Sequence, residues 1–300
     1  MLIKMQVGEQ DRGELQVNVT DSDNAPIRDA RVTISEPETA INPNSPIERL
    51  ETDVSGQTQI VDLNTPPLEY SLNENNENMP YANYNIQIEV PGYETENIRN
   101  VEILPDSLSL QNVRMRKREG EQVENIDIDP HTLYAEYPEK IPEDEIKDVN
   151  EPGEIVLSRV VIPEYVVVHN GTPSSNARDY YVTYKDYIKN VASSEIYATW
   201  PRATIEANVL AIMSFTLNRV YTEWYRNKGY DFTITSSTAY DQKWIYGRNI
   251  FQSIDEVVDE IFDQYLSRPD VRQPILTQYC DGKRVTCPNW HSQWGSCNLG

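Results

Sequence analysis

A single glutamate, Glu195, has the sequence surroundings that best suit acid–base chemistry. Tyr187 precedes it, and Tyr197 and the Trp200-Pro201 pair follow it. A carboxyl group held against aromatic rings loses hydration, so its pKa rises and it can keep a proton near neutral pH. The same rings suit stacking on sugars, and we expect the two tyrosines and the tryptophan to contact substrate. The alternative is a solvated glutamate in a turn beside aromatic residues of the core, and the sequence leaves both interpretations open.

Two helical patterns between residues 184 and 225 flank the turn in which we expect Glu195. The second pattern begins after Pro201, which the first helical turn accepts because no N–H is needed there. Its apolar residues recur at helical spacing over a wide stripe, which predicts a largely buried helix. They are Ile205, Val209, Leu210, Ile212, Met213, Leu217, Val220 and Trp224.

This stretch resembles the signature of the stage II sporulation protein D (SpoIID) family of peptidoglycan lytic transglycosylases. In that signature a glutamate precedes Trp-Pro and a helix of the type Ala-Leu-Lys-Ala-Gln-Ala-Val-Ala-Ala-Arg-Ser-Tyr. Glu195 matches the family's catalytic glutamate, and four helix positions keep the family pattern: Ala207, Ala211, Ser214 and Leu217. The resemblance covers residues 155–300 and implies a C-terminal α+β domain of the SpoIID type.

The helix departs from the family pattern at three positions. Asn208 replaces the usual glutamine and Phe215 replaces the tyrosine, and both changes are mild. Met213 stands where the family usually has an arginine, which can pair with a carboxylate or with substrate, whereas a thioether cannot. The resemblance therefore implies glycan cleavage, while Met213 favours an alternative. That alternative is a non-catalytic, peptidoglycan-binding or structural protein of a spore or phage-tail-like particle that retains the cleft.

The implied reaction, lytic transglycosylation, needs only one carboxyl group. We expect Glu195 to protonate the glycosidic oxygen and then to take the proton of the sugar C6 hydroxyl as the anhydro ring closes. This scheme accounts for the lack of an obvious carboxylate pair at the separation that glycosidases use. It requires no cofactor.

A polar and aromatic cluster at Tyr240, Asp241 and Gln242 follows the long helix. Carbohydrate sites combine rings, which cover C–H faces, with amides and carboxylates, which bind hydroxyl groups. The cluster also resembles the segment after the helix in the SpoIID family, so we expect these three residues to bind substrate. Asp241 is the best candidate for a second carboxylate, although ordinary packing of a loop explains it equally well.

The tail contains the run Ser292-Gln293-Trp294-Gly295, which resembles the closing motif of the SpoIID family. We expect Gln293 and Trp294 to contact substrate, with the glutamine dipole facing the positive charge of the transition state. The family usually continues beyond this motif, so we expect further residues after Gly300.

All three cysteines lie in this tail, with a histidine between them. Cys280, Cys287, His291 and Cys297 have the ligand types of a Cys₃His zinc site, and some members of the SpoIID family bind zinc near this region. The spacing lacks a Cys-x-x-Cys pair. A disulfide between Cys280 and Cys287 is the other interpretation, and the sequence does not decide between them.

The first part of the chain, residues 13–116, is predicted to form an all-β, Ig-like sandwich. Short segments such as residues 15–20, 31–35 and 84–90 alternate apolar and polar side chains between turns. The turn that ends at Gly56 resembles one in carboxypeptidase regulatory-like domains, as does a later Pro-Gly-Tyr motif. Such domains serve as spacers or attachment modules, which implies an assembly partner for this part of the chain.

Length and composition complete the expected organisation. The 300 residues suggest two domains. We expect an arm over residues 1–12, an acidic, proline-rich linker over residues 117–153 and the second domain from residue 154. The net charge of −22 argues against a nucleic-acid partner, because phosphate binding needs basic side chains.

No apolar run in the sequence is long enough to span a membrane, and the first residues lack the apolar core of a signal peptide. The resemblance to the SpoIID family implies peptidoglycan glycan strands as the partner, and without a signal peptide we expect them to be met at the wall, in the spore cortex or from within a particle.

Overall fold

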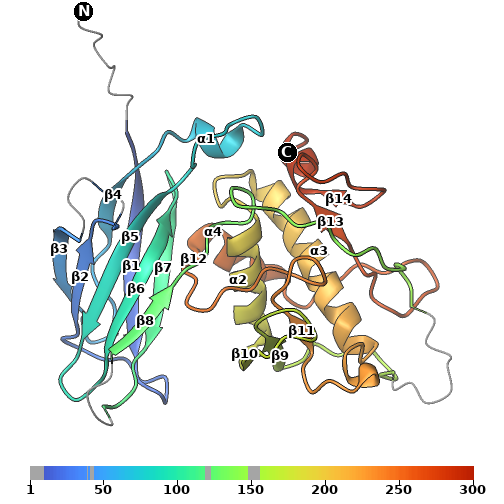
Figure 1. Ribbon diagram of the computed structural model, residues 1–300, viewed down its shortest axis with the longest axis horizontal. Helices are drawn as coiled ribbons and strands as arrows, with labels where there is room; N and C mark the ends of the chain where they lie inside the picture. Colours follow the sequence, from blue (N-terminus) through green and yellow to red (C-terminus); the bar gives the residue numbers. More distant parts are fainter. Residues whose placement is uncertain (1–9, 39, 41–43, 119–122, 148–155) are drawn as a thin grey trace, which may run out of the picture. The chain divides into compact units, whose positions relative to one another are not determined.

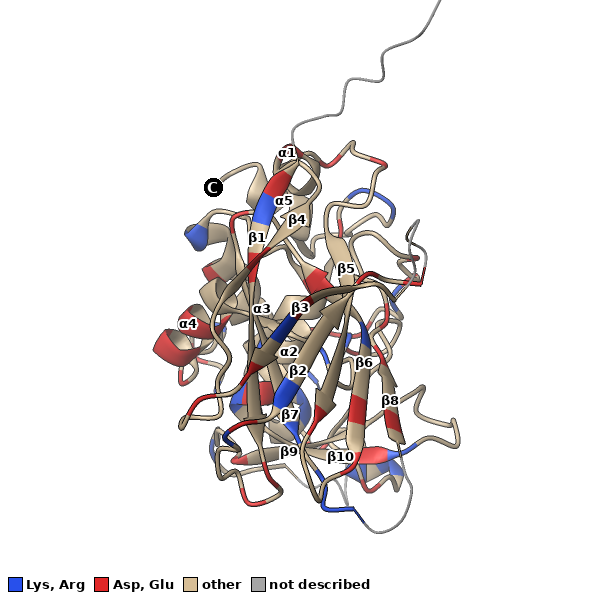
Figure 2. Ribbon diagram, turned by 90° about the vertical axis from the view of Figure 1, so that its left-hand side faces the viewer, with Lys and Arg blue, Asp and Glu red and all other residues tan. Residues whose placement is uncertain are grey.

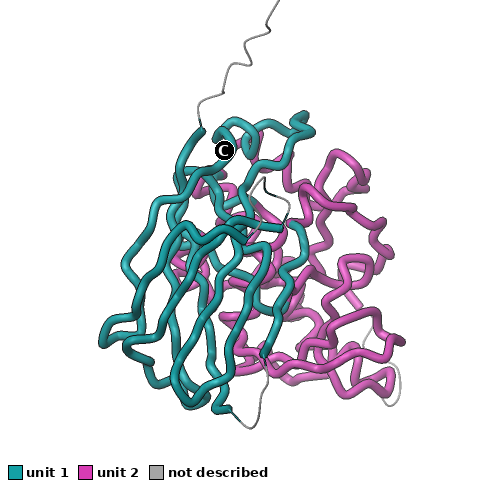
Figure 3. Tube along the Cα trace, turned by 60° about the vertical axis from the view of Figure 1, so that its left-hand side comes forward, with its two compact units in different colours: residues 1–130, 197–199, 246–253 teal, residues 131–196, 200–245, 254–300 magenta. Residues whose placement is uncertain are grey.

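A computed structural model describes residues 10–38, 40, 44–118, 123–147 and 156–300 (Figure 1). Acidic and basic side chains are distributed over strands, helices and loops (Figure 2). The chain divides into two compact units (Figure 3). Unit 1 comprises residues 1–130, 197–199 and 246–253, and unit 2 comprises residues 131–196, 200–245 and 254–300.

Unit 1 is built from two β-sheets (Figure 1). The first sheet has the order β12-β7-β1-β4, and its strands are β1 (Asp11–Thr20), β4 (Val61–Thr65), β7 (Leu108–Arg114) and β12 (Ile250–Phe251). The second has the order β3-β2-β5-β6-β8, and its strands are β2 (Arg31–Ser35), β3 (Pro46–Glu51), β5 (Ala82–Glu89), β6 (Thr95–Ile103) and β8 (Val123–Asp127). A short helix, α1 (Glu69–Leu72), completes the unit.

The strands follow from alternation of apolar and polar side chains. In β1, Leu15, Val17 and Val19 are fully buried, while the residues between them are partly or wholly exposed. In β5, Ile86 and Ile88 are buried in the same way. Since successive side chains of a strand point to opposite faces, each sheet acquires one apolar face, and these faces form the core of unit 1.

Unit 2 combines helices with small sheets, so it is an α+β unit (Figure 1). Its three-stranded sheet has the order β10-β9-β11, with β9 (Tyr165–His169), β10 (Asp179–Thr183) and β11 (Ile234–Thr235), and β13 (Tyr279–Cys280) pairs with β14 (His291–Ser292). Its helices are α2 (Tyr184–Glu195), α3 (Arg202–Tyr221), η1 (Arg226–Lys228), α5 (Gln293–Cys297) and, from Ile254 onward, α4 (Gln252–Ile261).

Helix α3 is largely buried, as its wide apolar stripe predicts. Helix α2 begins at Thr183, whose hydroxyl accepts a hydrogen bond from the Asp186 backbone N–H, a common N-cap arrangement. Helix α4 carries several acidic side chains (Figure 2), and two of them pair with Lys189 of α2, Asp255 at 2.7 Å and Asp259 at 3.1 Å. Among the described residues, no helix is both long and apolar enough to cross a membrane.

The β-rich architecture with more than one compact unit was predicted and is confirmed. Within the predicted linker, residues 117–153, the described residues belong to the two units, while residues 119–122 and 148–153 lie outside the described part of the chain. Residues 123–127, inside the range assigned to the linker, form strand β8, which pairs in parallel with β6. Residues 131–147 belong to unit 2. His131, Leu133 and Tyr137 are buried in this segment. Its acidic and proline-rich composition hid these buried residues, because composition averages over side chains that point in different directions.

Two further boundaries differ from the prediction. Strand β1 begins at Asp11, inside the range assigned to an N-terminal arm, and residues 1–9 lie outside the described part of the chain. Residues 246–253, assigned to the second domain, belong to unit 1, because Ile250 and Phe251 pair with β7. Strand pairing over long sequence separation is what local patterns cannot show.

Alanine substitutions at two glycines with positive φ, Gly56 and Gly92, test the packing of unit 1. Gly56 has a φ of 73°, and a Cβ atom there would lie 2.5 Å from the Val19 carbonyl oxygen. Gly92 has a similar φ of 86°, but a Cβ atom there would meet nothing within 4 Å beyond its chain neighbours. Gly92→Ala should therefore destabilise unit 1 by about 1–2 kcal/mol through backbone strain alone. Gly56→Ala should cost at least about 1 kcal/mol more, because overpacking adds to the strain.

Urea unfolding of both variants, followed by circular dichroism, whose β-sheet signal comes largely from the strands of unit 1, measures the difference. Equal loss of stability in the two variants would contradict the close packing assigned to Gly56.

Candidate functional site

Glu195 is the last residue of α2, not a turn residue as predicted, and its side chain is fully buried. One carboxylate oxygen, Oε1, accepts a hydrogen bond from the backbone N–H of Lys243 at 2.7 Å. The other, Oε2, accepts a hydrogen bond from the hydroxyl of Tyr279. Burial raises the pKa of Glu195 above its ordinary value, while the charge of Lys140 and these two hydrogen bonds oppose the rise.

Lys140 is the cation of this site. Its ammonium group is buried, lies 4.0 Å from the centre of the Tyr279 ring and donates a hydrogen bond to the Asp241 backbone carbonyl at 3.2 Å. Burial lowers the pKa of Lys140, and the negative charge of Glu195 opposes that change. An acid and a base therefore share one dehydrated environment, in which their interaction is strong.

Two glutamines form hydrogen bonds with buried tyrosines, and one of them, Gln293, also contacts Glu195. The Gln293 side chain donates to the Glu195 backbone carbonyl at 3.2 Å and accepts from the Tyr137 hydroxyl at 3.5 Å. The Gln242 side chain accepts from the Tyr187 hydroxyl at 3.1 Å. Burial raises the pKa of both tyrosines well above the ordinary value, so they remain hydrogen-bond donors at any physiological pH.

The remaining predicted substrate-binding residues are distributed unevenly. Trp200 and Trp294 are buried and pack against each other, with ring centres 5.0 Å apart. Tyr240 exposes 37% of its surface. Tyr197 is buried but belongs to unit 1. The structure thus places Gln293 in contact with Glu195, joins Tyr187 to Gln242 by a hydrogen bond and uses the two tryptophans in packing.

Asp241 is fully engaged by neighbours in unit 2. Its Oδ1 accepts from the Arg219 guanidinium at 2.7 Å, and its Oδ2 accepts from the Tyr225 hydroxyl at 2.6 Å and from the hydroxyl of Thr235 at 2.6 Å. Arg219 is fully buried and also forms a bidentate pair with Glu143. Asp241 therefore holds a buried arginine in place, which is the packing interpretation of this residue rather than the substrate-binding one.

The four residues predicted as zinc ligands do not form a metal site. Cys280 and Cys287 are joined by a disulfide, so their sulfurs are not thiolate ligands. His291 contacts the Asn208 side chain at 3.0 Å, and Cys297 lies outside the disulfide. The zinc prediction is corrected to the disulfide alternative. The ligand types were right for zinc, but the loop that follows β13 joins only two of the sulfurs, those of Cys280 and Cys287.

A hollow of about 550 Å³ lies beside the tail motif in unit 2. Residues from the start of α3, from the tail and from α5 line it: Ala203, Thr204, Ala207, Trp290, His291, Ser292, Gly295, Ser296, Leu299 and Gly300. Within the motif, Ser292 and Gly295 face this hollow, while Gln293 and Trp294 are buried. The motif therefore contacts Glu195 through Gln293 and lines the hollow through Ser292 and Gly295.

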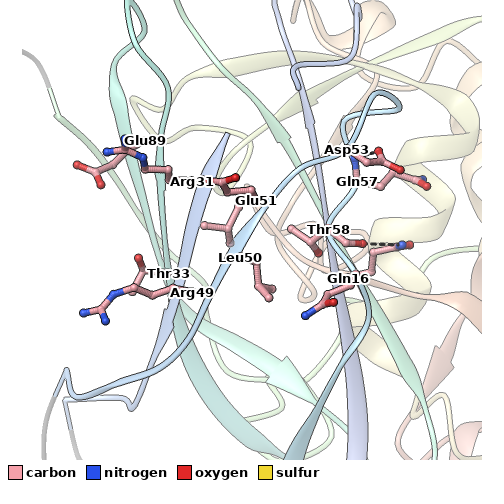
Figure 4. A pocket seen from close by; sticks show the side chains of 12 residues that line it. Gln16, Arg31, Thr33, Arg49, Leu50, Glu51, Asp53, Gln57, Thr58 and Glu89 are labelled. Atoms are coloured by element: carbon pink, nitrogen blue, oxygen red, sulfur yellow. Dashed lines mark hydrogen bonds between the residues drawn. The ribbon is translucent and has the colours of Figure 1, made fainter. Parts of the chain in front are cut away.

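A larger hollow, of about 900 Å³, lies on unit 1 (Figure 4). Strands β2, β3 and β5 and the turn after β3 line it with side chains of both signs, among them Arg31, Arg49, Glu51 and Glu89. Figure 4 shows these side chains around an open surface, and no group of acid, base and nucleophile converges among them.

His169 contacts Asp179 at 2.6 Å through Nδ1 and lies 3.2 Å from the Ser175 hydroxyl through Nε2. This order of groups suggests nucleophilic catalysis, but the Ser175 hydroxyl donates its hydrogen bond to the Thr172 carbonyl at 2.7 Å. The histidine also lies 3.2 Å from the Ser175 carbonyl oxygen. The arrangement closes a turn, so His169 is a satisfied structural residue.

Sequence reasoning missed Lys140, Tyr279 and Arg219. Arg219 could have been identified from the sequence, because it is the charged residue among the buried positions of α3. Lys140 lies among acidic residues in the segment taken for a linker, and Tyr279 adjoins a cysteine that drew attention to metal binding. Neither residue had a local pattern that distinguished it.

Comparisons with known proteins leave the family open. No family model and no curated protein matches the chain. Solved structures that match part of the chain include catechol 1,2-dioxygenase of Acinetobacter radioresistens, at 14% identity over 40% of this chain and a TM-score of 0.27. The minor pilin GBS52 of Streptococcus agalactiae matches at 17% identity over 38% of this chain, with a TM-score of 0.26. This chain covers 58% of the dioxygenase and 48% of the pilin.

The buried pair between Arg219 and Asp241 should dominate the stability of unit 2. Arg219→Met removes the cation but leaves Asp241 and Glu143 without their partner, so we expect a loss of about 3–5 kcal/mol. The matched control is Arg226→Met, because Arg226 is 56% exposed and lies 3.5 Å from Glu223. That variant should lose at most about 1 kcal/mol. Urea unfolding measures both, and similar losses would contradict the role assigned to Arg219.

Proposed function

We propose that unit 2 cleaves the glycan strands of peptidoglycan by lytic transglycosylation, with Glu195 as general acid and then general base. The observation that carries the proposal is a buried glutamate whose pKa is raised by burial and which sits among tyrosine hydroxyls and a lysine. Such an environment keeps a carboxyl group protonated at a pH where an exposed one is ionised.

Glu195 carries the proton in both steps of the proposed reaction. The Glu195 carboxyl gives its proton to the glycosidic oxygen, and the C1–O bond breaks as the leaving sugar takes that proton. The resulting carboxylate accepts the proton of the C6 hydroxyl while the C6 oxygen bonds to C1, which forms a 1,6-anhydro ring. No water is consumed, and Glu195 ends the cycle protonated as it began.

Lys140, Tyr279 and the backbone N–H of Lys243 support the intermediate stage, in which Glu195 is ionised. All three stabilise its negative charge: the lysine by its own charge, the others by hydrogen bonds. The Glu195 carboxylate must then take up a proton again, and burial favours this because it raises the pKa of Glu195. Since Glu195 is fully buried, side chains that cover it must move before a sugar can reach it.

The proposal places unit 2 in the SpoIID-like family and unit 1 among carboxypeptidase regulatory-like sandwiches that serve as attachment modules. The resemblance at Glu195, the Trp-Pro pair and the tail motif supports the first assignment. The two-sheet construction and the Gly56 turn support the second.

One observation favours a second candidate, a non-catalytic protein that binds peptidoglycan or builds a spore or phage-tail-like particle. Both carboxylate oxygens of Glu195 are already hydrogen-bonded inside unit 2, and its side chain has no exposed surface. Met213, the departure from the family pattern, is also fully buried. In this case Glu195 would have only a structural role, in the interior of unit 2.

Glu195→Gln separates the two candidates. The amide keeps the size of the side chain and can still bond to Lys243 and Tyr279, so the fold should persist. It holds no transferable acid proton, so we expect glycan cleavage to fall by about 10²-fold or more. Mass spectrometry of muropeptides after incubation with purified peptidoglycan reports the reaction directly, because anhydromuramic ends form only by transglycosylation.

The matched control is Glu206→Gln, at a partly exposed position on α3. It should release anhydromuramic ends at the wild-type rate. If the wild-type protein binds peptidoglycan but produces no such ends, the structural candidate replaces the enzyme.

Lys140→Met tests the electrostatics of the site. The charge of Lys140 lowers the pKa of Glu195, so its removal should raise that pKa further. Because the acid form of Glu195 starts the reaction, activity falls as pH rises through its pKa. The alkaline limb of the pH–rate profile should therefore move to higher pH in Lys140→Met.

The control for this experiment is Lys185→Met, an exposed lysine on α2. Its alkaline limb should stay at the wild-type position. An unchanged limb in Lys140→Met, with the fold intact by circular dichroism, would show that Lys140 does not act on the acid.

A further inference from the structure

Three glutamates converge at one edge of the five-stranded sheet of unit 1. Glu94 precedes β6, Glu96 lies within β6, and Glu124 lies on β8. Glu96 and Glu124 are direct partners in the parallel pairing of these strands. One carboxylate oxygen from each of the three residues lies within 4.8 Å of the others.

Glu96 is the unusual member of the cluster. Only 2% of its surface is exposed, and no hydrogen-bond donor among the described residues reaches either of its carboxylate oxygens. Burying an ionised carboxylate without a partner is costly, so side chains in this position are normally paired or bound to a metal. Burial accordingly raises the pKa of Glu96.

Arg116 is the basic side chain that contacts the cluster. It forms an ion pair with Glu124 and lies 4.0 Å from Glu94. Three carboxylates and one guanidinium leave two negative charges when all are ionised. A divalent cation balances that charge, whereas Arg116 alone does not.

We propose that Glu94, Glu96 and Glu124 form a Ca²⁺ site that joins β6 to β8. Carboxylate oxygens are hard ligands, and the cluster contains no sulfur or imidazole to favour zinc. Three carboxylates, each able to bind through two oxygens, suit the six to eight oxygen ligands of Ca²⁺. Mg²⁺ fits less well, because it requires a tight octahedron and retains several waters.

An ion can reach the cluster from the side of Glu124, whose side chain is 21% exposed. Strand β8 is the outer strand of its sheet and pairs with β6 over five residues. A cation between the two strands would therefore fix an edge strand, which has a single neighbour in this sheet.

Isothermal titration calorimetry of the full chain with CaCl₂ tests the site. We expect one Ca²⁺ per chain, and a thermal transition that rises with Ca²⁺ concentration because the ion binds the folded state. Glu96→Gln keeps the shape of the side chain and should weaken Ca²⁺ binding by about tenfold or more, since affinity follows the charge of the ligands. Glu124→Gln should weaken it as well, which guards against a fold defect in one variant.

The matched control is Glu14→Gln, which removes one exposed charge from β1 and should leave binding unchanged. Absence of saturable binding up to about 10 mM Ca²⁺, beyond the weakest protein sites of this kind, would overturn the proposal. Equal affinity in the wild type, Glu96→Gln and Glu124→Gln would overturn it too.

Terbium luminescence locates the ion independently. The Tyr246 hydroxyl lies 3.4 Å from Glu124 Oε1, so this tyrosine should sensitise emission from Tb³⁺ bound in the cluster. Tyr246→Phe should bind Tb³⁺ with unchanged affinity by calorimetry but emit less, and Ca²⁺ should displace the ion. Emission that Tyr246→Phe does not reduce would place the ion elsewhere and contradict the site.

Discussion

The removal of the Glu195 carboxyl group from water is the constraint on which the rest of unit 2 depends. A buried carboxylate needs donors and a counter-charge, and here Lys243, Tyr279 and Lys140 provide them. These groups come from three separate segments, so the site exists only when the segments are packed together. Burial of α2 and α3 therefore stabilises the fold and also keeps the Glu195 carboxyl group away from water.

Unit 2 contains two groups of buried carboxylates, and a different basic side chain stabilises each group. Around Asp241 and Glu143, Arg219 provides a cation that is always charged and forms several well-aligned hydrogen bonds. Around Glu195 the cation is a lysine whose own pKa is lowered by burial and which acts on the carboxyl group through its charge. The arginine cluster is therefore suited to holding segments together, whereas the lysine opposes the effect of burial on the pKa of Glu195.

Local patterns predicted the parts of the fold that depend on neighbouring residues. The alternation in β1 and the apolar stripe of α3 indicated these elements, whereas the aromatic residues near Glu195 left open whether it is buried or solvated. The sequence could not show that the charge of Lys140 would act on a residue 55 positions away, because the surroundings of Lys140 are acidic and rich in proline. The cysteines also show this limit: their types allowed zinc or a disulfide, and only the folded position of the two sulfurs decides.

The segment formed by residues 131–147 has a practical consequence for dissecting the chain. It contributes Tyr137, Lys140 and Glu143 to unit 2, although it precedes the stretch that resembles a known family. A fragment that starts at residue 154 would contain Glu195 without its lysine and Arg219 without one of its two carboxylates. The smallest piece that can be expected to fold and titrate like the parent begins at His131, where the contacts of unit 2 begin.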